Sequence, residues 1–329
     1  MSEKKLPLIS VVLPLYNAEK FIEAAVRSIL DQSFRDLELI VLNDGSKDNS
    51  LAVLNAIKDE RLIVIDQANM GMGPTINKGI ALAKGKYIAR QDHDDLSAPE
   101  RLTKQLAFLE ANPAVALVGT AAEIIDENGK ATGRFHKHVC SNMEIRATLY
   151  FDNPFVHSSV MFRKDAIEKT GTYNVSIPSL LQDFELWFRF SKEFELANLP
   201  ESLVLYRELL SGMSRTNINY AGVVAGQTWL QLQLLIKDAQ LRDFSFFYHR
   251  CFDDCGEMNT SAAKKIFEKI IIAFADKNKL SHEEAKKVFS AISNHFKEGC
   301  LDHKVYASKG STLKKIISKT ERKIFRPRK

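Results

Sequence analysis

Three carboxylates crowd into four residues of this chain, at Asp92, Asp94 and Asp95. An apolar run ends at Ala89 and a helical pattern begins near Pro99, so we expect a strand, a sharp turn and a helix here. Like charges this close raise one another's pKa, and a hard divalent cation is the usual compensation. Asp92 and Asp94 are therefore candidate ligands of Mn²⁺ or Mg²⁺. For an isolated Asp-x-Asp, a solvated turn that caps the next helix is the alternative.

The elements that must position this turn alternate between strand and helix over the first hundred residues. Nearly continuous apolar runs predict strands at 8–13, 37–42, 61–65 and 86–89, and helical spacing predicts helices between them. Strands separated by helices imply right-handed crossovers and a doubly wound, mainly parallel α/β sheet. Ligands of such sheets bind beyond the carboxyl ends of the strands.

Polar residues follow each of these strand ends. The ring of Tyr16 could stack on a base, although packing alone explains it equally well. Asp44 could accept a hydrogen bond from a base or a sugar, or simply hold its own turn. The glycine-rich loop after Asn69 lets backbone N–H groups approach a ligand, but it lacks the lysine of a P-loop and the G-x-G-x-x-G pattern. A nucleotide diphosphate held by a carboxylate-bound cation accounts for all of these loops.

Several motifs in this order and spacing resemble one known family. They are Val11–Asn17, Asn43–Ser46, Arg90–Asp95, Pro99-x-Arg101 with Gln105, Asn112-Pro113 and Val118-Gly119. On these motifs the chain resembles family 2 glycosyltransferases of the GT-A fold over roughly residues 6–210. The resemblance implies transfer of a sugar, with inversion, from a nucleotide-diphosphate donor.

The resemblance also implies a set of donor-binding residues. Asp44 would bind the base, while Asp92 and Asp94 would bind the ribose, the diphosphate and the metal. The nucleotide-sugar-binding residues expected in this way are Pro14, Tyr16, Asn17, Asp44, Asn69, Asn77, Arg90, Asp92 and Asp94. Where the family often has Arg-Asn, this chain has Ile76-Asn77, so Arg90 or Lys78 would have to supply the missing cation.

A glycosyltransferase needs a general base, because an acceptor hydroxyl is a poor nucleophile. Gln182-Asp183 resembles the acidic pair of the family with its first acid replaced, which makes Asp183 the expected base. Its structural alternative is the N-cap of a helix from Phe184 to Lys192. A strand is expected at 155–163. The segment after Tyr206 resembles the one that closes over the donor, but it lacks the family's occasional metal-binding histidine.

Composition bounds the remaining possibilities. The 329 residues are 45% hydrophobic and 26% charged, and no apolar run reaches the ~20 residues of a membrane span. The polar start predicts a protein that is not secreted, and the four scattered cysteines predict reduced thiols in the cytosol. We expect a glycosyltransferase domain at 1–215, a helical region at 216–300 and a basic tail at 301–329.

The excess of positive charge belongs to the tail. It holds ten Lys or Arg and two acidic residues, a formal charge of +8, which leaves −3 for the rest of a chain whose net charge is +5. Apolar residues such as Leu313, Ile316 and Ile317 share one helical face, with lysines around it. A basic amphipathic helix predicts attachment to an anionic membrane surface; a solvated or docked tail is the alternative.

The sequence thus predicts a metal-dependent, inverting glycosyltransferase of hexosyltransferase type at the cytoplasmic face of the membrane. It would move a sugar from a UDP-sugar or similar donor to a glycan or lipid-linked acceptor during surface polysaccharide or glycolipid synthesis, with no nucleic-acid partner. Two alternatives remain at this stage: a nucleotidyltransferase, and a non-catalytic sugar-nucleotide-binding or assembly protein.

Overall fold

The computed structural model describes residues 6–150, 152–209, 231, 235 and 260–290. The chain divides into two compact units. The first unit combines Met1–Asn142 with Phe155–Gly212, and the second combines Met143–Pro154 with Met213–Lys329. The expected boundaries at 215 and 300, and the basic tail 301–329, lie outside the described residues, so that division stays a prediction.

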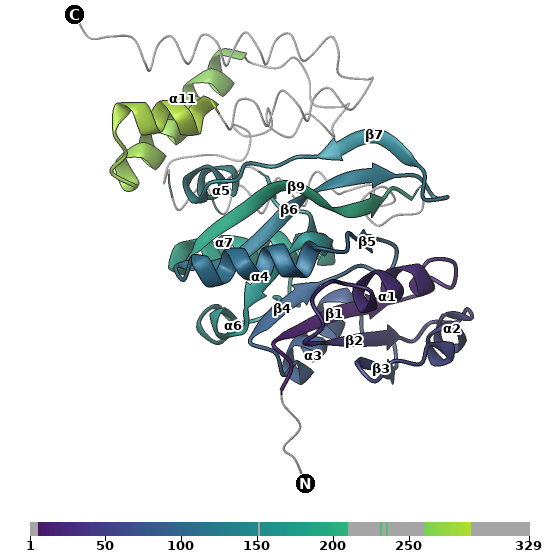
Figure 1. The fold of residues 1–329 in the computed structure, drawn as a ribbon. Coiled ribbons are helices and arrows are strands. Elements are labelled where there is room, and N and C mark those ends of the chain that lie inside the picture. Colours follow the sequence, from purple (N-terminus) through teal and green to yellow (C-terminus); the bar gives the residue numbers. More distant parts are fainter. Residues whose placement is uncertain (1–5, 151, 210–230, 232–234, 236–259, 291–329) are drawn as a thin grey trace, which may run out of the picture. The chain divides into compact units, whose positions relative to one another are not determined.

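The first half of unit 1 alternates strands and helices, as the sequence predicts (Figure 1). Its four strands run parallel in the order β3-β2-β1-β4. They are β1 (Ile9–Leu15), β2 (Leu37–Asp44), β3 (Leu62–Gln67) and β4 (Tyr87–Arg90). The connecting helices are α1 (Ile22–Leu30), α2 (Ser50–Ala56) and α3 (Met72–Leu82).

The same sheet continues beyond β4 as β8-β6-β9-β5, with β7 paired to β6. These strands are β5 (Leu96–Ser97), β6 (Val115–Ile125), β7 (Ala131–His136), β8 (Met161–Arg163) and β9 (Glu195–Arg207). β8 runs antiparallel to both β4 and β6, so β6 and its parallel neighbour β9 point the same way as β1 to β4. The predicted α/β fold with a mainly parallel sheet is confirmed.

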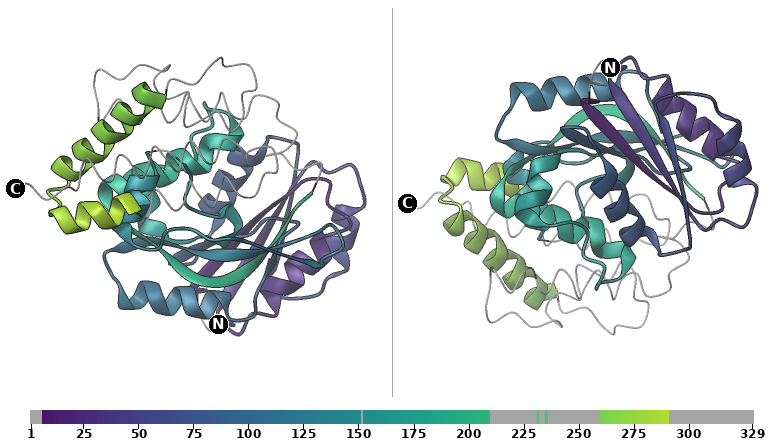
Figure 2. Two further views of the ribbon diagram at one scale, coloured as in Figure 1. Left: turned by 90° about the horizontal axis from the view of Figure 1, so that it is seen from above. Right: turned by 90° about the horizontal axis from the view of Figure 1, so that it is seen from below.

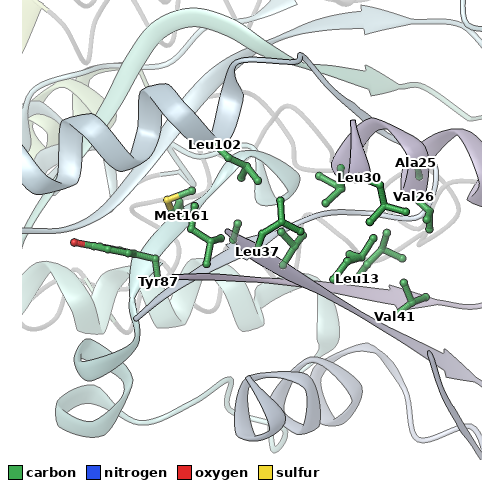
Figure 3. Close-up of a cluster of buried hydrophobic side chains, with 14 of the residues drawn as sticks. Leu13, Ala25, Val26, Leu30, Leu37, Val41, Tyr87, Leu102 and Met161 are labelled. Atoms are coloured by element: carbon green, nitrogen blue, oxygen red, sulfur yellow. The ribbon is translucent and has the colours of Figure 1, made fainter. Parts of the chain in front are cut away.

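Helices cover both faces of this sheet (Figure 2). Leu13 and Val41 point to the face that α1 and α4 (Arg101–Ala111) cover, and they share one apolar cluster with Val26, Leu30 and Leu102, labelled in Figure 3. Burying an aliphatic side chain of this kind stabilises the fold by about 1.5 to 3 kcal/mol. Val12 points to the opposite face, where α3 approaches so closely that a Cβ on Gly79 would meet its side chain.

An aromatic cluster on that second face surrounds Trp187 of α7 (Gln182–Glu193). The rings of Phe162, Tyr173 and His157 lie 6.0 to 6.4 Å from the Trp187 ring in tilted or edge-on arrangements. Such arrangements match the charge distribution of aromatic rings. The cluster fixes α7 against β8 and thereby sets where the N-terminus of α7 lies.

The prediction of a strand at 155–163 is wrong for the first half of that range. Residues His157–Ser159 form a 3-10 turn, η1, and β8 begins only at Met161. The Ser159 hydroxyl donates to the Val156 carbonyl at 2.8 Å and accepts from the Thr120 N–H at 3.1 Å. These side-chain bonds to the backbone compete with a strand ladder, which explains the turn.

Unit 2 is helical where it is described, as expected. It contains α5 (Asn142–Thr148), α11 (Thr260–Lys277) and a helix at 282–290. The rings of Tyr150 and Phe274 meet edge to face at 5.9 Å within this unit. Ser281 and Glu284 form a reciprocal capping box before the last helix. No helix in the described ranges is long and apolar enough to cross a membrane.

Candidate functional site

The carboxyl ends of four parallel strands bring the predicted site residues to one edge of the sheet. Because β1 to β4 run in the same direction, Tyr16, Asp44, the loop after β3 and Asp92 all follow strand ends on that edge. The edge is where doubly wound sheets bind ligands.

Asp44 is the last residue of β2 and organises the neighbouring loop. Its buried carboxylate accepts the N–H groups of Met70 and Gly71 at 2.8 and 2.9 Å and the amide of Gln67 at 2.9 Å. Asn69 donates to the Asp44 carbonyl at 2.8 Å. The structure therefore gives Asp44 and Asn69 a role in shaping the loop, whether or not Asp44 also meets a base.

Tyr16 and Asn17 form an exposed turn at the end of β1. Tyr16 is 45% exposed, and its contact with a base stays a prediction. Asn17 adopts φ 48°, a left-handed conformation that asparagine tolerates, and its side chain accepts the Lys47 N–H at 2.8 Å. Pro14 lies inside β1, buried, with its carbonyl 3.3 Å from His93 Nδ1. These contacts join the ends of β1 and β2 and the acidic turn.

Arg90 ends β4 and is almost completely buried. Its guanidinium donates to Asp92 Oδ1 at 2.6 Å and to the Gln91 carbonyl. Burial alone would raise the pKa of Asp92, but the adjacent Arg90 charge holds that pKa well below its usual range. Asp92 is therefore an anion in the absence of any ligand.

Asp94 and Asp95 differ from Asp92. Burial raises the pKa of Asp94, and the charge of Asp92 adds to that effect. Asp95 is buried, accepts the Arg207 N–H at 2.7 Å and accepts the Ser158 hydroxyl. Burial and the two neighbouring carboxylates raise its pKa well above the usual value. Asp95 thus anchors the turn to β9 and η1, whereas the other two carboxylates remain for a ligand.

A buried polar network supports the turn from behind. All five N–H groups of Arg101 meet acceptors: Gln91 Oε1, Ser97 Oγ, Gln105 Oε1 and the carbonyls of Arg90 and Val160. Burial is the main cause that lowers the pKa of Arg101 to about 9, so it stays charged at neutral pH. Arg101 and Gln105 belong to the sequence motif, but their role was not predicted from sequence.

Arg207, at the end of β9, is a second support that sequence reasoning missed. It donates to the carbonyls of Asp94, Asp126 and Glu127 at 2.8 to 3.0 Å, and its guanidinium lies over the Phe21 ring at 4.9 Å. The signal in the sequence was its place beside Tyr206 in the segment expected to close over the donor. The rest of that segment, after Leu209, lies outside the described residues.

Asp183 lies in the first turn of α7, which begins at Gln182 instead of Phe184. Its carboxylate accepts the N–H of Phe184 at 2.7 Å, so the helix-terminal role and the expected catalytic role coexist. Burial raises the pKa of the Tyr173 phenol, and the charges of Arg90, Asp183 and Asp92 all act on it as well. The Tyr173 phenol is therefore within electrostatic range of both the acidic turn and the expected base.

His157 completes this buried cluster. Its Nε2 is 2.9 Å from the Tyr173 hydroxyl. Burial, together with the charge of Arg90, lowers the pKa of His157 to about 3, so the ring is neutral at physiological pH. A neutral ring held in a hydrogen bond inside an aromatic cluster gives His157 a structural role.

Asn77 faces Tyr173 from α3. Its amide donates to the Tyr173 carbonyl at 2.8 Å, and its Oδ1 accepts the Tyr173 N–H at 2.9 Å. Contact between Asn77 and a donor stays a prediction. Ile76 is buried, and Lys78 is only partly exposed on the next position of α3.

A metal ion has two carboxylates available in the acidic turn. Among the residues that the structure describes, no group of three or more His, Cys, Asp or Glu side chains is arranged to hold a metal ion. Asp92 and Asp94 nevertheless fit a hard cation, since they offer oxygen ligands and repel each other. Water and diphosphate oxygens would have to complete the coordination.

Comparison with known proteins gives the family. The family model "Glycosyl transferase family 2" matches residues 10–171. The putative glycosyltransferase EpsE of Bacillus subtilis is 32% identical over 241 residues, which are 70% of this chain and 85% of EpsE. This chain belongs to glycosyltransferase family 2. The family 2 chain is also 34% identical over 206 residues to AmsE, the amylovoran biosynthesis glycosyltransferase of Erwinia amylovora, covering 61% of this chain and 76% of AmsE.

Solved structures show the same GT-A fold as this family 2 chain. Residues 1–349 of S. aureus TarS, in complex with UDP-GlcNAc, give a TM-score of 0.58 at 15% identity, and the match covers 96% of this chain and 90% of that TarS chain. A mannosyltransferase of Pyrobaculum calidifontis, in complex with GDP-Man and Mn²⁺, gives a TM-score of 0.55 at 15% identity. That match covers 98% of this chain and 89% of the mannosyltransferase chain. The predicted fold class and the predicted family are both confirmed.

Proposed function

We propose that this family 2 glycosyltransferase moves a sugar, with inversion, from a nucleotide-diphosphate sugar to a hydroxyl of a glycan or lipid-linked acceptor. The observation that carries the proposal is the convergence of Asp44, the loop after β3 and Asp92 at the carboxyl ends of parallel strands, in a chain that belongs to family 2. This is the place where a doubly wound sheet binds a ligand, and the charges of Asp92 and Asp183 both act on the buried Tyr173 phenol.

The reaction assigns a role to each part of this arrangement. Asp183 takes the proton of the acceptor hydroxyl, whose oxygen bonds to the anomeric carbon as the bond from that carbon to the diphosphate oxygen breaks. The nucleoside diphosphate leaves with the bonding electrons. Asp92 and Asp94 would hold Mn²⁺ or Mg²⁺, which offsets the charge of the diphosphate when it is bound. Arg90 keeps Asp92 ionised for this purpose.

The donor and the biological setting rest on relatives. TarS was solved with UDP-GlcNAc, which supports a UDP-sugar, and the mannosyltransferase with GDP-Man and Mn²⁺, which supports a metal. AmsE is named for amylovoran biosynthesis, which supports the synthesis of a surface polysaccharide or glycolipid. We place the enzyme at the cytoplasmic face of the membrane, held by the basic tail at 301–329, which lies outside the described residues.

The test begins with binding. The full chain is titrated calorimetrically with UDP, GDP and their sugars in Mn²⁺ and in EDTA, and slow hydrolysis of the tightest donor is then followed. We expect Asp183→Asn to lower the hydrolysis rate by on the order of 10² to 10⁴ while the donor Kd is unchanged, because only proton transfer is lost. Asp165→Asn is the matched control, since Asp165 is the exposed second residue of helix α6 (Lys164–Thr170), as Asp183 is the second residue of α7.

Two results would contradict the proposal. A weaker donor Kd with an unchanged rate in Asp183→Asn would remove the base assignment. Donor binding without hydrolysis or transfer, even with glycan and lipid-linked acceptors supplied, would support the non-catalytic binding protein instead.

A further inference from the structure

The segment that leads into α7 is attached to α3 at two places. The first is Asn77, whose side chain makes the pair of hydrogen bonds to the Tyr173 backbone. The Asn77 carboxamide therefore both donates to and accepts from the backbone of Tyr173, as two paired residues do in neighbouring β-strands. Both polar ends of Asn77 are thereby used within the protein.

The second attachment is between Gly73 and Gln182. A Cβ placed on Gly73 would overlap the Gln182 carboxamide, with the Gln182 Cδ only 2.8 Å away. Gln182 is 4% exposed and donates from Nε2 to the Ile177 carbonyl at 3.0 Å. Gly73 has no left-handed backbone, so its lack of a side chain serves this contact and not a turn.

Both attachments lie on one face of α3, because Gly73 and Asn77 are four residues apart in the helix. The start of α3 is in turn fixed to the donor side. Gly71, its N-cap, donates to the Asp44 carboxylate, and Thr75 in its first turn donates an N–H to the Gly71 carbonyl. Helix α3 therefore contacts Asp44, on the side where the donor is expected, through Gly71. It contacts the segment before Asp183 through Gly73 and Asn77.

We propose that the face of α3 formed by Gly73 and Asn77 is a positioning surface that sets where Asp183 lies relative to the donor. The proposal rests on the proposed function, since it takes Asp183 as the base. Gly73 and Asn77 touch no reacting atom in this role; they act through Gln182, which directly precedes Asp183, and through Tyr173.

The proposal makes an unusual prediction for Gly73→Ala. Alanine forms helices better than glycine, so the substitution is not expected to unfold α3. The added methyl would instead displace the Gln182 carboxamide, which is 4% exposed and held by the Ile177 carbonyl, and under our proposal this repacking shifts the neighbouring Asp183. Displacement of a catalytic group by about 1 Å costs on the order of 10² in rate. We expect Gly73→Ala and Asn77→Ala each to lower the rate constant for hydrolysis or transfer by about 10- to 100-fold, with the donor Kd of Gly73→Ala unchanged within about threefold.

A double-mutant cycle separates positioning from other causes. Gln182→Ala removes the atoms that the new methyl would meet. The rate constant of the double variant Gly73→Ala with Gln182→Ala should therefore be at least about fivefold higher than the value expected if the two single effects were independent. Asn112→Ala is the control for Asn77→Ala: Asn112 also donates a side-chain hydrogen bond to the backbone, to Phe108 at 2.8 Å, but at the end of α4. Hydrogen exchange of the amides at 171–181 should accelerate in Asn77→Ala and not in Asn112→Ala.

The outcomes distinguish this proposal from the proposed function. If Asp183→Asn keeps the full rate, the base assignment fails and this proposal fails with it. If Asp183→Asn is inactive while Gly73→Ala and Asn77→Ala keep the wild-type rate, only the positioning role is overturned. It is also overturned if Gly73→Ala weakens donor binding and Gln182→Ala does not restore the rate, because Gly73 would then serve the approach of the donor.

Discussion

Arg101 supports the acidic turn through Gln91 and the Arg90 carbonyl. Its five N–H groups are matched to five acceptors in a site without water-accessible surface. Lysine has three donors and no planar fork, so Arg101→Lys would leave buried acceptors unsatisfied. We expect the free energy of unfolding to fall by about 2 to 4 kcal/mol. Urea denaturation followed by circular dichroism measures it.

A matched change elsewhere separates this effect from a general cost of losing arginine. Arg27→Lys alters an exposed i,i+4 pair with Glu23 and should change the free energy of unfolding by less than about 0.5 kcal/mol. Equal losses in both variants would show that the network behind the acidic turn contributes no special stability.

Asp94 gives a prediction about metal binding. Its carboxylate is destabilised by burial and by the charge of Asp92, which a cation would offset. We expect Asp94→Ala to abolish the Mn²⁺-dependent part of UDP affinity and to leave the affinity in EDTA unchanged. Isothermal titration with and without EDTA measures both, with Asp165→Ala as the control. Unaltered Mn²⁺ dependence would exclude Asp94 as a ligand.

Sequence reasoning nominated candidates from local patterns and missed residues whose role depends on distant partners. Asp92 and Asp94 were nominated from residue type and spacing, and Asp183 from the family resemblance; their roles stay predictions. The separate role of Asp95 was not, because its partners Ser158 and Arg207 lie 63 and 112 residues away.

At the scale of elements, a carboxylate joins the start of β3 to the end of α1. Asp59 accepts three hydrogen bonds from Arg61, which also donates to the Leu30 carbonyl at 2.8 Å. The hydrogen bond from Arg61 lowers the pKa of Asp59 below its ordinary value. A lowered pKa in the folded state stabilises the protein above the unfolded pKa, near 4, and this contribution is lost as the pH falls through the lower value.

We therefore expect Asp59→Asn to reduce the free energy of unfolding by about 1 kcal/mol at pH 7. The difference from wild type should shrink below about pH 4, as the wild-type carboxylate becomes protonated. Thermal unfolding of both proteins between pH 7 and pH 3 measures the trend. A difference that stays constant over this range would show that the charge of Asp59 is not what stabilises the junction.

The secondary-structure elements predicted best were those whose pattern can be recognised within one short segment of sequence. β1 to β4 and the helices between them were predicted because each strand is a continuous apolar run and each crossover is short. β9 was not predicted, because it contains Pro200, which argues against a central strand. The structure accommodates Pro200 at a shift in the register between β6 and β9, where Leu199 and Ser202 face consecutive residues of β6.

At the scale of the whole molecule, charge is divided between the tail and the rest. The tail carries +8 and the remaining residues −3, so attraction to an anionic membrane would come from the tail. We expect replacement of Lys314, Lys315, Lys319, Arg322 and Lys323 by Gln to lower binding to vesicles containing phosphatidylserine by at least about 100-fold, given about 1 kcal/mol for each basic residue.

Co-sedimentation of the full chain with vesicles measures this binding. Neutral vesicles, and the pair Lys286→Gln and Lys287→Gln on the exposed side of the helix at 282–290, are the controls. Wild-type binding that is independent of vesicle charge would contradict the role of the tail. Donor hydrolysis should be unaffected by these changes, since the tail is not part of the proposed active site.

The interleaving of the two units has a consequence for synthesis on the ribosome. Residues 143–154 belong to unit 2, yet they emerge before β8, α7 and β9 complete unit 1. Tyr150 therefore precedes its ring partner Phe274 by more than a hundred residues. At ordinary elongation rates that interval is on the order of ten seconds. Tyr150 therefore does not have Phe274 to pack against until well after β8, α7 and β9 have been synthesised.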